Sequence, residues 1–154
     1  MLKPKYNTML TQTLSEIYER DLLKLKEEIN LYKNETDLWL LKNEISNSAG
    51  NLCLHLIGNL KHFIGATLGN TGYVRTRDLE FSSKNIPRQK ILSDIDETIL
   101  IVKNTLGKLS ATDLEKDFPL QVFNKVFSTQ HMLLHLLKHL SYHLGQINYH
   151  RRLI

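Results

Sequence analysis

The sequence predicts an all-α protein, an antiparallel four-helix bundle with a long connection between the second and third helices. Apolar residues recur every three or four positions in four separate segments, which is the spacing of one face of an α-helix. Capping and turn residues stand at the ends of these segments, and few stretches suggest a β-strand. Four amphipathic helices bury their apolar faces by packing against one another.

The first helix is predicted from about residue 10 to near Asn34, and the second from the polar residues 46–48 to residues 69 and 70. The first has its apolar positions on one side: Leu10, Leu14, Ile17, Tyr18, Leu22, Leu25, Ile29 and Tyr32. The second has an equivalent set: Leu52, Leu56, Ile57, Leu60, Phe63, Ile64 and Leu68. Serine and asparagine favour the start of a helix, and glycine followed by asparagine favours its end.

The third and fourth helices follow two long connections. Residues 70–86 lack helical periodicity and are predicted to form an ordered loop, with at most a short extended piece. Pro87 suits the first turn of a third helix over residues 87–106. A connection broken by Pro119 leads to the last helix, which Ser128 or the next residue can cap. The apolar face of that helix comprises Leu133, Leu136, Leu137, Leu140, Leu144 and Ile147.

Length and composition fit a single domain over residues 1–154. Hydrophobic residues make up 42% of the chain and charged residues 23%, as in ordinary globular proteins. The net charge of +4 is scattered among nearly as many acids as bases, so nucleic acid is a disfavoured partner. No segment approaches the roughly 20 apolar residues of a membrane span, and no signal-peptide run is present. We therefore expect a cytoplasmic protein with no membrane partner, whose single cysteine, Cys53, is a buried apolar residue.

Clustered histidines are the most unusual feature of the sequence. All seven lie in the second and last predicted helices. His139 and His143 are one helical turn apart, so both project from one face and can reach a single ion. The apolar face of the last helix lies nearest to His143 and then to His139, whereas His135 and His131 rotate outward.

A third nitrogen is expected from the second helix. His55 borders its apolar side, and His62 shares that edge two turns later. We prefer His55, because it stands in a more continuous apolar stretch. Three imidazoles with an open coordination position suit a Lewis-acid metal. Isolated histidines near apolar faces are more often hydrogen-bonded core or surface residues, so an interpretation without a metal stays open. A contribution of His62 or His135 to the metal site also stays open.

The run HLSYHLGQ, which starts at His139, resembles the H-x-x-x-H-x-G-Q signature on the last helix of DinB-like proteins. The segment NLCLHLIGNL around His55 resembles the first ligand position of that superfamily, and RDLEF at residues 77–81 resembles a segment of one subfamily of unknown function. The resemblance spans roughly residues 10–150. It implies an antiparallel four-helix bundle, a metal held by His55, His139 and His143, and a homodimer.

Two amides are candidates for orienting the ligands. Asn59 lies one turn beyond His55, and Gln146 lies three residues beyond His143. An ordinary polar contact between helices, or tight packing beside Gly145, explains them equally well.

Some DinB-like proteins are thiol-dependent transferases or isomerases. The resemblance therefore implies a metal-dependent enzyme that activates a low-molecular-weight thiol against a small electrophile, because a coordinated thiol loses its proton and becomes the nucleophile. Hydrolysis by metal-bound water is a second chemistry of such a site. Glu44 and Glu80 are the nearest acids for it, and neither belongs to a catalytic motif. Arg77, Asp78 and Glu80 are expected to anchor the long loop through structural ion pairs.

The alternative function belongs to another class. It is a noncatalytic dimeric interaction protein, related to stress responses, in which the metal is structural or incidental. Divalent zinc or nickel is the favoured ion, with iron, copper or manganese as alternatives, because imidazole suits several of these metals. A di-iron carboxylate site is disfavoured because the paired Glu-x-x-His pattern is missing.

Overall fold

The fold is helical in the computed structural model, which describes residues 5–154 and the side chains from residue 9 onward. No β-strand occurs in that range; only isolated bridges do. The expected all-α class is therefore confirmed. None of the helices in the described part of the chain has the length and apolarity that crossing a membrane requires.

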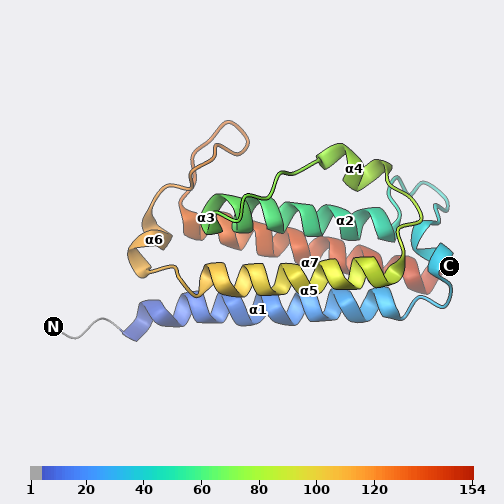
Figure 1. Ribbon diagram of the computed structural model, residues 1–154, viewed down its shortest axis with the longest axis horizontal. Helices are drawn as coiled ribbons and strands as arrows, with labels where there is room; N and C mark the ends of the chain where they lie inside the picture. The colour runs from blue at the N-terminus through green and yellow to red at the C-terminus, as the bar shows by residue number, and fades with distance from the viewer. Residues whose placement is uncertain (1–4) are drawn as a thin grey trace.

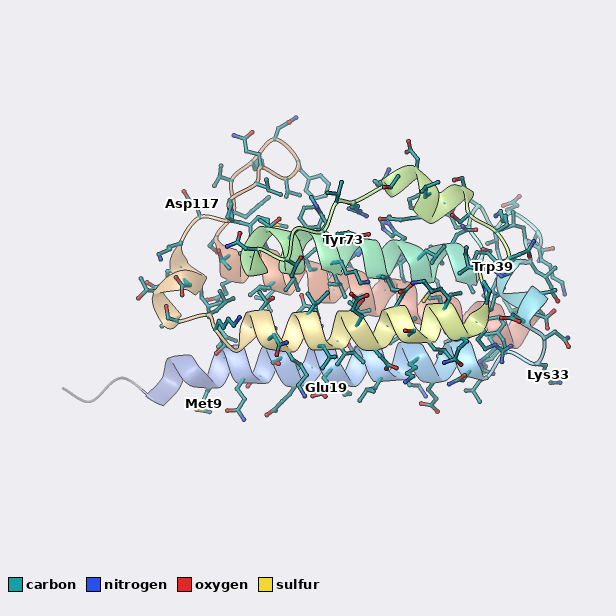
Figure 2. All side chains as sticks on the ribbon, in the orientation of Figure 1. Met9, Glu19, Lys33, Trp39, Tyr73 and Asp117 are labelled. Carbon is teal, nitrogen blue, oxygen red and sulfur yellow. The ribbon has the colours of Figure 1, made fainter. Side chains whose placement is uncertain are left out.

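Four long helical segments lie side by side along the longest axis of the molecule (Figure 1). They are α1 (Lys5–Asn30), α2 (Ala49–Leu60) with its continuations η2 (Lys61–Ala66) and α3 (Thr67–Gly69), α5 (Arg88–Leu106), and α7 (Thr129–Leu153). Helix α1 packs against α5 and α7, and α2 packs against the same two helices. Side chains fill the space between the helices (Figure 2), and each of the four segments therefore has two neighbours against which to bury its apolar face.

The apolar faces expected from periodicity form the core. The buried residues of α1, for example, include Leu14, Leu22, Leu25 and Ile29. Tyr18, which also lies on this face and is fully buried, carries a polar group into the core. The Tyr18 hydroxyl donates to the carbonyl oxygen of Leu133 in α7 at 2.6 Å, which satisfies a group that would be costly to bury unpaired.

Helix ends agree with the capping prediction in two places. The Ser48 hydroxyl accepts the backbone N–H of Asn51 at the start of α2, and the Ser128 hydroxyl accepts that of His131 at the start of α7. Two ends differ. Helix α1 stops at Asn30, earlier than expected, and Pro87 precedes the first turn of α5 as its N-cap.

The two long connections contain short helices that the sequence analysis missed. Residues 70–86 include α4 (Arg77–Ser82), and the later connection includes α6 (Ala111–Glu115); a 3-10 helix, η1 (Glu35–Trp39), precedes α2. The expectation of a loop without helix at 70–86 was therefore wrong. A helix of one or two turns is too short to show periodicity, and α4 is held by tertiary contacts. The Asn51 amide in α2 donates to the carbonyl oxygens of Glu80 and Ser83 at 2.9 and 2.8 Å.

Candidate metal centre

Three imidazoles converge between α2 and α7. His55 comes from α2, and His139 and His143 come from successive turns of α7. The Nε2 atom of His139 lies 3.1 Å from the Nε2 atoms of both His55 and His143. One nitrogen from each ring lies within 4.8 Å of the other two. The three side chains could therefore hold one metal ion together.

His55 is oriented by a buried ion pair. Its Nδ1 atom donates to Glu80 Oε2 at 2.9 Å, and Arg75 donates to both carboxylate oxygens of Glu80 at 2.7 and 2.9 Å. Burial opposes ionisation of Glu80, but the hydrogen bonds from His55 and Arg75 outweigh it and hold the pKa of this carboxyl below its ordinary value. An ionised carboxylate only accepts hydrogen bonds. His55 therefore carries its proton on Nδ1 and presents the lone pair of Nε2 to the other histidines.

His143 is held in the same way by an amide. Its Nδ1 atom lies 2.6 Å from Gln146 Oε1. The amide oxygen is an acceptor, so Nδ1 of His143 donates and Nε2 again presents a lone pair. Burial holds the pKa of His143 below its ordinary value, although the hydrogen bond to Gln146 raises it. The predicted contact between Gln146 and His143 is therefore present.

His139 lies between the other two rings and is neutral at pH 7. Burial, followed by the charges that His143 and His55 can carry, lowers its pKa to about 4. Its Nδ1 atom is buried and has no hydrogen-bond partner in the described part of the chain. A neutral imidazole has one proton, so Nε2 of His139 can donate to only one of the two lone pairs that face it.

The donor set fits a divalent metal ion. Metal–nitrogen bonds of about 2.0–2.1 Å place two nitrogens of one coordination sphere about 2.9 Å apart at a right angle and about 3.3 Å apart at the tetrahedral angle. The two close Nε2 pairs are separated by 3.1 Å. An ion at this point would also accept both lone pairs that His139 cannot satisfy together. Oriented Nδ1 donors are typical of histidines that bind metals.

The other histidine and amide candidates do not join this cluster. His62 lies in η2 with its ring against Phe63, and the ring of His135 contacts Phe123. Asn59 is buried, but its Oδ1 atom has no partner among the described residues, and no hydrogen bond connects it to a ligand histidine. Glu80 forms an ion pair, as expected, and its partner is Arg75; sequence reasoning did not foresee that it also contacts His55 directly. The RDLEF resemblance pointed to its segment without revealing that contact.

Among the residues that the structure describes, three cavities are lined by one or more of the three clustered histidines, and one of about 250 Å³ lies beside His139. A cavity of about 270 Å³ is lined by His55 and His139, and one of about 510 Å³ is lined by His143 and Gln146. The centre is therefore accessible to small molecules, unlike a closed structural metal site.

These features define an all-helical protein with a cluster of three histidines that could bind a metal. The chain belongs to the family described as "Protein of unknown function (DUF1572)", whose model matches residues 7–154. No curated protein matches the chain.

Proposed function

We propose that the protein is a DinB-like, metal-dependent enzyme in which His55, His139 and His143 hold one divalent ion. The observation that carries this proposal is the meeting of three Nε2 atoms, two of which have their lone pairs directed inward by hydrogen bonds at Nδ1. We further infer that the four long helical segments form an antiparallel bundle of one domain. Zinc and nickel are the divalent ions that we expect three neutral imidazoles to hold here.

Thiol transfer is the chemistry that this site supports best. A divalent ion supplies Lewis acidity, which lowers the pKa of a coordinated thiol and so makes it a nucleophile. The three histidines would hold the ion, and hydrogen bonds to Glu80 and Gln146 orient the rings of His55 and His143. Arg75 keeps Glu80 ionised and in place. The cavities lined by His143 and by His55 and His139 would hold a low-molecular-weight thiol and a small electrophile beside the centre.

Hydrolysis is less well supported because it needs a base to assist the attacking water. Glu80 is engaged by both His55 and Arg75. Glu44 lines the same cavity as His143, but it lies on an exposed segment and accepts no hydrogen bond from a ligand histidine. A coordinated thiol releases its proton to solvent before it attacks, so the attacking thiolate needs no base at that moment.

The alternative, a dimeric interaction protein, is favoured by one observation. Large apolar side chains are exposed along α7, and they include Leu134, Tyr142, Tyr149 and Leu153. Their spacing places them near one face of the helix. Such a face fits an interface with a second copy, and a homodimer is compatible with either function.

Elemental analysis of the untagged protein after incubation with zinc or nickel tests the metal site. We expect about one ion per chain in the wild type and little in His139→Ala. The matched control is His131→Ala, which removes an exposed histidine from the same helix and should retain the metal. Wild-type protein that binds no metal would contradict the proposal. The loaded protein is then assayed for consumption of glutathione, bacillithiol or mycothiol with a chloronitroarene, and a metal-loaded protein inactive with all three would favour the interaction protein.

A further inference from the structure

The cavity lined by His55 and His139 has the size and walls of a binding site for a small organic molecule. It lies between α2, α7 and the two connections that carry α4 and the residues before α7. In Figure 1 these connections both lie on the side of α2 that faces away from α1. Its volume is about 270 Å³. At about 30 Å³ for each water in the liquid, this space equals that of about nine waters, or a molecule of about ten non-hydrogen atoms.

The cavity is positively charged. Arg75 and Arg77 line it, and no aspartate or glutamate does. Arg75 is engaged by Glu80. Arg77 makes no ion pair with any residue that the structure describes, and its guanidinium lies over the ring of Phe81, 5.2 Å from the centroid. One guanidinium at the rim is therefore free to bind an anion.

Another part of the lining is aromatic and is built on a strained turn. Val122 and Lys125 exchange two backbone hydrogen bonds of 3.0 and 3.1 Å, which leaves Phe123 and Asn124 as a two-residue turn with φ of 54° and 58°. Such turns favour asparagine and glycine, and phenylalanine is costly in this conformation. The Phe123 side chain is 74% exposed, so it adds little to the core. Strain of this kind is found at functional sites, and here it places an aromatic ring beside the cavity.

We propose that this cavity binds a small organic carboxylate, whose anionic group pairs with Arg77 and whose apolar body packs between Phe63 and Phe123. The planar guanidinium matches a carboxylate through two parallel hydrogen bonds. A monoanion suits a site with one free guanidinium better than a phosphate dianion does. The ligand then lies beside His55 and His139, so the substrate of the proposed enzyme is an electrophile that carries a carboxylate. The identification of the substrate rests on the proposed metal centre, whereas the binding of a carboxylate in the cavity does not.

The test compares carboxylates of about ten non-hydrogen atoms with their matched neutral amides, with phenylacetate and phenylacetamide as the first pair. Affinities are measured by NMR titration on zinc-loaded protein and on chelator-stripped protein. We expect phenylacetate to bind at least about tenfold more tightly than the amide, because the hydrogen bonds to Arg77 are charge-assisted. Arg77→Gln should abolish this preference in both samples.

Arg152→Gln is the matched control, because Arg152 is also exposed and also lies over an aromatic ring, that of Tyr149. It should keep the preference. Equal binding of acid and amide by the wild type, no binding of any pair, or a preference that survives Arg77→Gln would overturn the proposal. A preference that survives Arg77→Gln but is lost on removal of zinc would place the carboxylate on the metal instead. Zinc content, measured on the same samples, shows separately whether the metal centre fails.

A second pair of variants tests the aromatic wall. Phe123→Asn should raise the melting temperature, because asparagine tolerates the left-handed conformation, and should weaken phenylacetate binding. Asn124→Gly relaxes the neighbouring position of the same turn and keeps the ring, so it should leave the affinity unchanged. Unchanged affinity in Phe123→Asn would overturn the assignment of this wall.

Discussion

Replacing Glu80 with glutamine tests whether the proposed metal ligands depend on their hydrogen-bond partners. In the native protein the carboxylate accepts from His55 at 2.9 Å and from Arg75 at 2.7 and 2.9 Å. The side chain of Glu80 is 7% exposed and that of Arg75 is 12% exposed. Glu80→Gln keeps the shape of the side chain but removes its charge and replaces one acceptor oxygen with a donor.

The expected effects follow from that loss. The amide has a single acceptor oxygen for two partners, so His55 is no longer held with Nε2 directed inward whenever Arg75 takes that oxygen. Loss of such a partner lowers metal affinity by about 10- to 100-fold in characterised sites. Arg75 also loses its counter-charge in a largely buried position, which costs about 3 to 5 kcal/mol where burial is complete. We expect a smaller loss of about 1 to 3 kcal/mol, because the amide still accepts one hydrogen bond.

The assay is zinc competition against a chromogenic chelator, with urea unfolding of the same samples. Glu97→Gln is the control, because Glu97 also pairs with a basic residue, Lys61, but is 61% exposed and makes no hydrogen bond to the three histidines. The control should keep the zinc affinity of the wild type. An unchanged zinc affinity in Glu80→Gln would refute the argument that Glu80 orients His55.

Three further outcomes are expected. Gly58→Ala should lower zinc affinity much as Glu80→Gln does, because a Cβ at Gly58 would overlap the carboxylate of Glu80 and displace it; competition with the chelator measures this, and wild-type affinity would count against it. The metal-free protein should lose stability as the pH falls from 6.5 towards about 4, because burial lowers the pKa of His139 to about 4 in the folded state and the unfolded chain binds more protons in that window. Urea unfolding at several pH values tests this, and the same pH dependence in His139→Gln would contradict it. Tyr18→Phe should destabilise the fold by about 0.5 to 1.5 kcal/mol, because one buried hydrogen bond is lost while the Leu133 carbonyl keeps its bond within α7; an unchanged urea midpoint would argue against this.

The long helices and the three close histidines were accessible to sequence reasoning because both depend on regular spacing. Periodicity locates an amphipathic helix, and a separation of four residues places His139 and His143 on one face. The burial of Cys53 was predictable for the same reason, and it is fully buried with its pKa raised by desolvation.

The parts that escaped prediction depend on tertiary contacts. Helix α4 is too short for periodicity, and the Asn51 amide fixes it to α2. The role of Glu80 follows from that docking, since nothing in the order of residues places a side chain from the connection against His55. Arg77 has no ion-pair partner in the part of the chain that the structure describes, because no aspartate or glutamate lines the cavity. This arrangement also depends on the fold and could not be predicted from the sequence.

X-ray absorption spectroscopy at the metal edge of the zinc-loaded protein tests the central claim most directly. We expect three imidazole nitrogens at about 2.0–2.1 Å from the ion and no sulfur from the buried Cys53. A spectrum with fewer than three imidazoles, or one unchanged by His139→Ala, would contradict the assignment of His55, His139 and His143 as the ligands.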